Sequence, residues 1–110
     1  MATNNPRWLD VVRHNIRGVR APFLLVVQHH AVPAPTRLVA PVSPPVAGDV
    51  EVLAPRLLVN HTQLHVRLLD ISAVRLSLLG ETVASAADQS DAILDAMDII
   101  LRGYPVGLPN

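Results

Sequence analysis

The sequence contains no cysteine and no lysine, and only 3% of its residues are aromatic. The absence of cysteine excludes a disulfide framework, a thiolate nucleophile and a cysteine-ligated zinc site. The few aromatic side chains leave little for stacking on unpaired bases, so we expect no direct binding to nucleic acid. Because lysine is absent, all 9 basic residues are arginines, and each cation is a planar fork of donors.

The chain also lacks a long apolar run. The longest stretch near the front, residues 23–27, is far too short to span a bilayer, and residues 1–6 have no signal-peptide character. We therefore expect a cytoplasmic protein without membrane contact. With 110 residues, 50% of them apolar and 16% charged, the composition predicts one small globular domain.

The formal net charge is zero, but it is unevenly distributed along the chain. Residues 1–49 carry five arginines against two aspartates, whereas residues 50–110 carry four arginines against seven acidic residues. This difference favours a polarised surface or the association of opposite ends of two copies.

The clearest local pattern is an amphipathic helix over residues 91–102. Apolar residues recur there at steps of three and four, on one helical face: Ile93, Leu94, Met97, Ile100 and Leu101. Asp88 or Ser90 is a candidate N-cap, and Gly103 followed by Pro105 ends the helix. The apolar stripe at Met97, Ile100 and Leu101 is our candidate for a dimer interface.

The remainder of the chain has the pattern of short strands. Apolar runs separated by turn residues predict strands over residues 9–13, 23–28, 37–41, 56–59, 64–69 and 79–84. Four prolines within residues 41–55 predict a long surface loop in place of a central strand, with a short edge strand near residues 50–52. Strands in series before one helix predict a β-rich α+β domain with an antiparallel sheet.

Together these segments resemble the CcdB family of toxins, whose fold is an SH3-like barrel with a C-terminal helix, shared with MazF ribonucleases. Residues 20–28, ending in Val27-Gln28, are similar to the family's second strand, and Arg37 to Val42 to its Arg-apolar-apolar-apolar-Pro-Leu segment. The other similar segments are residues 9–15, the turn at 70–74, the strand at 79–84 and the helix at 91–103.

The resemblance implies a toxin of a type II toxin–antitoxin system that needs no cofactor and is not an enzyme. Such a toxin is a homodimer that binds the gyrase A protein of DNA gyrase through its C-terminal residues and traps the cleaved-DNA complex. Its partner is a CcdA-like antitoxin whose disordered C-terminal segment folds on binding. The positions that match the family's gyrase contact are Arg102, Gly103 and Tyr104. We expect a flexible N-terminus at 1–8, the toxin domain at 9–104 and an extension at 105–110.

Two other functions fit parts of the sequence. Arg13, Arg17 and Arg20 around the first turn give a basic spot that could contact phosphate, as in a MazF-like ribonuclease. Alternatively, a CcdB-fold homologue with Arg102 and six further residues after Tyr104 could have lost or changed its gyrase target.

The remaining polar residues form no recognised catalytic or metal motif. His61 and His65 lie in a predicted hairpin, and His29 and His30 point to opposite faces if the chain is extended, so we predict no metal site. No serine lies in a Gly-x-Ser-x-Gly frame. The helix carries an acidic stripe that consists of Asp88, Asp91, Asp95 and Asp98. This stripe could receive a basic antitoxin segment, but an ordinary solvated helix face is the favoured interpretation.

Overall fold

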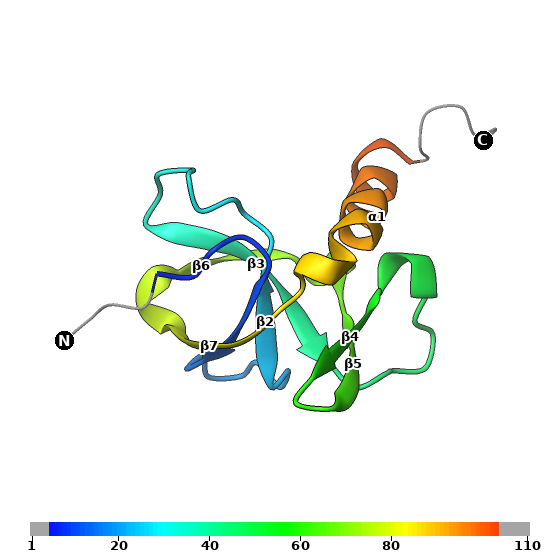
Figure 1. Ribbon diagram of the computed structural model, residues 1–110, viewed down its shortest axis with the longest axis horizontal. Coiled ribbons are helices and arrows are strands. Elements are labelled where there is room, and N and C mark those ends of the chain that lie inside the picture. The colour runs from blue at the N-terminus through cyan, green and yellow to red at the C-terminus, as the bar shows by residue number, and fades with distance from the viewer. Residues whose placement is uncertain (1–4, 104–110) are drawn as a thin grey trace.

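The computed structural model describes residues 5–103 (Figure 1). Seven strands precede an α-helix in this part of the chain: β1 (Asp10–His14), β2 (Phe23–Val26), β3 (Thr36–Ser43), β4 (Arg56–Val59), β5 (Thr62–Val66), β6 (Ser72–Arg75), β7 (Leu79–Ser85) and α1 (Ser90–Arg102). Four 3₁₀ turns connect them: η1 (Glu51–Leu53), η2 (Leu68–Asp70), η3 (Leu76–Leu78) and η4 (Ala87–Gln89).

All strand pairs are antiparallel and belong to one curled sheet. The strands follow the order β4-β5-β3-β2-β1-β7, and β6 pairs with β3 next to β5. The predicted β-rich α+β fold with an antiparallel sheet and a C-terminal helix is therefore confirmed. The turn expected over residues 70–74 is wrong, because β6 begins at Ser72 and pairs with β3.

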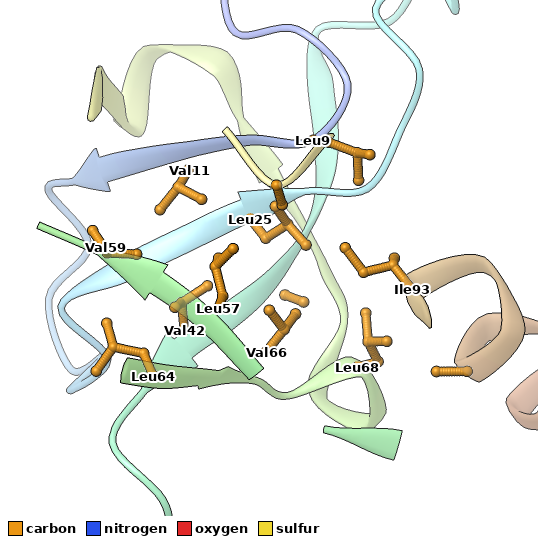
Figure 2. Packing of buried hydrophobic residues seen from close by; sticks show 13 residues of the cluster. Leu9, Val11, Leu25, Val42, Leu57, Val59, Leu64, Val66, Leu68 and Ile93 are labelled. Atoms are coloured by element: carbon orange, nitrogen blue, oxygen red, sulfur yellow. The ribbon is translucent and has the colours of Figure 1, made fainter. Parts of the chain in front are cut away.

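Apolar side chains fill both faces of the sheet, because neighbouring residues of a strand point in opposite directions. Val11 and Leu25 belong to one cluster, and their neighbours Val12 and Leu24 to the other. Figure 2 shows the first cluster, in which Ile93 of α1 lies near the side chains of the sheet. The curled sheet thus encloses the core that holds the helix in place.

The prediction that Pro41 ends the third strand is wrong, since β3 continues through it to Ser43. The Pro41 carbonyl accepts a hydrogen bond from Arg67 N at 2.8 Å. Because the C=O and N–H of one residue point to the same side of a strand, an N–H at Pro41 would also face the side of β5 and β6. On that side β6 pairs up to Val39 and β5 pairs from Val42 onward. Pro41 lies in the gap between the two partners, where no ladder bond is lost.

The segment after β3 departs from the prediction in a second place. The expected edge strand near residues 50–52 is wrong, and η1 stands there instead. Its backbone hydrogen bonds join residues three positions apart, as in a 3₁₀ helix. Leu53 N–H donates to Val50 O at 2.8 Å, and Ala54 N–H donates to Glu51 O at 3.1 Å. The predicted hairpin that follows is confirmed, with a tight turn in which Asn60 and His61 have φ of 52° and 67°.

Candidate functional site

The candidate site is the C-terminal end of α1, which projects away from the sheet (Figure 1). The predicted helix over residues 91–102 is confirmed, and it begins one residue earlier, at Ser90. The side chains of Ile93 and Ala96 are 2% and 0% exposed and fix the helix to the core. Toward its end the helix is more accessible, and Leu101 is 74% exposed.

The two ends of α1 are capped differently from each other. Neither Asp88 nor Ser90 is the N-cap, because η4 leads directly into the helix and makes Gln89 the residue that precedes it, without a side-chain cap. At the C-terminus the predicted glycine cap is confirmed: Gly103 has φ of 88°, and its N–H donates to Ile99 O at 2.8 Å.

Arg102 is fixed by an aspartate one helical turn earlier. Its Nε donates to Asp98 Oδ1 at 2.5 Å and its Nη2 to Oδ2 at 2.8 Å, a bidentate pair. The hydrogen bond from Arg102 holds the pKa of the Asp98 carboxyl below its ordinary value. The four-residue spacing of Asp98 and Arg102 is the sequence signal that identifies this pair.

The other predicted site residues of the helix lie around this end. Met97 and Ile100 are partly buried and pack against the first core cluster of their own chain. Leu101, the third residue of the predicted dimer interface, is on the surface. Tyr104, the third predicted gyrase contact, lies outside the described residues.

The four aspartates of the acidic stripe differ, because Asp98 is paired with Arg102. Asp88, Asp91 and Asp95 are exposed, whereas Asp98 is partly covered and neutralised by Arg102. Asp95 also lines an open hollow of about 460 Å³ beside α1, between the helix and the segment around η1.

The three arginines of the basic spot, Arg13, Arg17 and Arg20, differ in their contacts. Arg13 Nε forms an ion pair with Glu81 Oε1 on β7 at 3.0 Å, and the Arg13 guanidinium lies 5.8 Å from the centre of the Phe23 ring. Arg17 and Arg20 are exposed and have no ion pair within residues 5–103. These three arginines therefore differ in their freedom to meet an external anion.

In the described part of the chain, no three His, Asp or Glu side chains gather as metal ligands do. The expectation that His29 and His30 point to opposite faces does not apply, because both lie in the loop between β2 and β3. Their rings stack with centres 4.1 Å apart, and the Trp8 ring lies 6.1 Å from His29. Sequence reasoning missed this cluster because its residues belong to two separate segments.

The curled antiparallel sheet with a projecting C-terminal helix defines a β-rich α+β domain whose exposed helix end is its candidate contact surface. The family model described as CcdB protein matches residues 10–103, so the chain belongs to the CcdB family, the toxins of toxin–antitoxin systems. The matched region ends at Gly103, the residue that caps α1. A comparison with curated proteins found no match.

Proposed function

We propose that this toxin acts as a protein inhibitor of DNA gyrase, which it binds through Arg102, Gly103 and Tyr104, and that it is not an enzyme. The observation that carries this proposal is the family match that runs to Gly103, at the end of the projecting helix. A contact made from a helix end needs no catalytic group, and stabilising one state of the target is sufficient to poison it.

Arg102 is suited to such a contact. Its side chain is 54% exposed, so that a partner can reach the guanidinium while Asp98 holds it in one orientation. A side chain that is ordered before binding loses less conformational entropy when the complex forms. Arginine is also enriched among the residues that dominate binding energy at interfaces.

Binding of the full chain to the purified gyrase A protein tests the proposal by calorimetry. We expect Arg102→Ala to weaken binding by at least about thirtyfold, which corresponds to an interface hot spot of roughly 2 kcal/mol. Arg56→Ala is the matched control, because Arg56 is also an ion-paired surface arginine, 59% exposed, and lies far from Arg102 in the sequence. Equal affinities for the Arg102 variant and the native chain would reject this contact, and no binding of the native chain would reject gyrase as the target.

The remaining parts of the proposal concern partners and location. We propose a homodimer whose seam includes Met97, Ile100 and Leu101, and a CcdA-like antitoxin with a disordered C-terminal segment. Residues 9–104 then form the toxin domain and 105–110 an extension, in the cytoplasm. Within the described chain, α1 is too short to cross a membrane.

A further inference from the structure

A second group of residues, far from α1 in the sequence, includes several hydrogen-bond donors that have no acceptor within residues 5–103. Arg7 precedes β1, His29 and His30 lie in the loop between β2 and β3, and Arg37 is the second residue of β3. We call these four residues the donor cluster. Trp8 N–H connects the two segments, because it donates to His30 Nδ1 at 3.2 Å.

The backbone fixes which nitrogen of each imidazole carries the proton. Ala31 N–H donates to His29 Nδ1 at 3.0 Å, as Trp8 N–H does to His30 Nδ1. An amide N–H can only donate, so both Nδ1 atoms are unprotonated and each neutral ring carries its proton on Nε2. Neither Nε2 has an acceptor within residues 5–103. The stacked rings therefore offer two N–H donors from one loop.

Arg37 adds a buried positive charge that forms no ion pair with a carboxylate of residues 5–103. Its side chain is 5% exposed, and it is the one charged residue that is buried in the described chain. Its Nη1 donates to the carbonyls of Ala34 and Thr36, both at 3.1 Å. Its Nε is buried and has no hydrogen-bond partner in the described part of the chain. A buried cation that no acid neutralises is costly, and an anion from outside the chain would relieve that cost.

Most of the ionisable groups around His30 are basic. Burial lowers the pKa of His30, and the neighbouring Arg7, His29 and Arg37 side chains lower it further. Asp10 is the acidic group that opposes them. Its Oδ2 already accepts hydrogen bonds from Arg7 N at 2.9 Å and Thr82 Oγ1 at 3.1 Å. The region is therefore rich in donors and poor in free acceptors.

We propose that the donor cluster binds one phosphate-type oxyanion. Its oxygens accept from the Nε2–H groups of His29 and His30 and from the Arg7 guanidinium, while its charge compensates Arg37. The anion is either free inorganic phosphate or a phosphodiester of a nucleic acid, because both present the same oxygens. This site is independent of the proposed gyrase contact.

Titration of the full chain with inorganic phosphate tests the site, at neutral pH and with ionic strength held constant by sodium chloride. Trp8 is the one tryptophan of the sequence, so its fluorescence reports on the cluster, and NMR follows the imidazole Nε2–H signals. We expect a saturable response with a Kd of about 1 mM. No saturable response in either signal would overturn the proposal.

Substitutions separate a built site from general attraction to positive charge. Arg7→Gln removes an exposed charge without disturbing the core, and we expect about tenfold weaker phosphate binding. His30→Asn keeps an acceptor for Trp8 N–H through Oδ1 but removes the Nε2–H donor, with a similar expected loss. Arg17→Gln is the control, since it also removes an exposed arginine, from the turn after β1. Equal weakening by Arg17→Gln and Arg7→Gln would overturn the proposal.

A second titration distinguishes free phosphate from a phosphodiester of a nucleic acid. A short single-stranded oligothymidylate is titrated against the same protein, and inorganic phosphate is added as competitor. If the oligonucleotide binds, competes with phosphate and loses affinity in Arg7→Gln, the site takes a phosphodiester. If phosphate binds and the oligonucleotide does not, the site takes free phosphate. Oligonucleotide binding that phosphate leaves unchanged, without phosphate binding, contradicts the proposed site.

Discussion

Arg67 connects the long proline-rich segment after β3 to the sheet. Its Nε donates to Ser43 Oγ and its Nη2 to Pro44 O, both at 2.7 Å, and its Nη1 forms an ion pair with Asp49. Asp49 Oδ2 in turn accepts from Val46 N–H at 2.8 Å. The two side chains are 15% and 18% exposed, so this pair is shielded from solvent more than the other ion pairs of the described chain.

The Asp49 pair predicts a pH dependence of stability. The hydrogen bonds from Arg67 and from Val46 N–H hold the pKa of Asp49 below its ordinary value of 3.8. The stabilisation is therefore complete above pH 3.8 and is lost as the pH falls through the lower folded-state pKa. We expect the native chain to be more stable than Asp49→Asn near neutral pH, with a difference that shrinks in acid.

Urea unfolding across the acid range measures this difference. Glu81→Gln is the control, because the Arg13–Glu81 pair is exposed, with 72% of the Glu81 side chain accessible, and exposed pairs contribute little. A stability difference for Asp49→Asn that stays constant down to the most acidic pH would contradict the role given to this ion pair.

Among the elements, α1 is anchored to the core most of all by Ile93, the larger of its two buried side chains. Ile93 is 2% exposed within the main core cluster, whereas its neighbour Leu94 is 50% exposed. We expect Ile93→Ala to lower the free energy of unfolding by about 2–5 kcal/mol through lost burial and a residual cavity. Leu94→Ala, in the same helix, should change it by less than about 0.5 kcal/mol. Equal effects in chemical denaturation would show that α1 is not anchored through Ile93.

Elements whose signals are local in the sequence could be predicted. The helix was predictable because its apolar residues repeat with the helical period and a glycine ends it. The β4–β5 hairpin was predictable for a similar reason, with a polar turn between two apolar runs. For the candidate site, the positions of Arg102 and Gly103 at the helix end followed from the same pattern.

Features that depend on contacts between distant segments could not be predicted. Pro41 is tolerated in β3 because β5 and β6 pair with different parts of that strand, which no local pattern reveals. The ring stack of His29 and His30 depends on Trp8 and on a loop conformation. The N-cap of α1 could not be predicted, because η4 leads into the helix without a side-chain cap.

For the molecule as a whole, the proposed homodimer requires that Leu101 lie in the interface between the two copies. This side chain is 74% exposed near the end of α1, and an apolar residue so accessible in the monomer is readily covered by a second copy. We expect Leu101→Glu to yield monomers in sedimentation velocity, because the seam would bury an unpaired charge. Leu58→Glu, at a leucine 66% exposed on β4, should leave the dimer intact. A dimer that persists in Leu101→Glu, or dissociates equally in both variants, would place the seam elsewhere.

We propose that this CcdB-family toxin poisons gyrase through the end of α1. The most direct test incubates the purified chain with gyrase, supercoiled plasmid and ATP, and measures linear DNA after detergent and protease treatment. We predict that linear DNA accumulates with the native chain and decreases sharply with Arg102→Ala, while Arg56→Ala behaves like the native chain. If a folded native chain yields no linear DNA in an assay where a known poison yields it, this toxin does not poison gyrase.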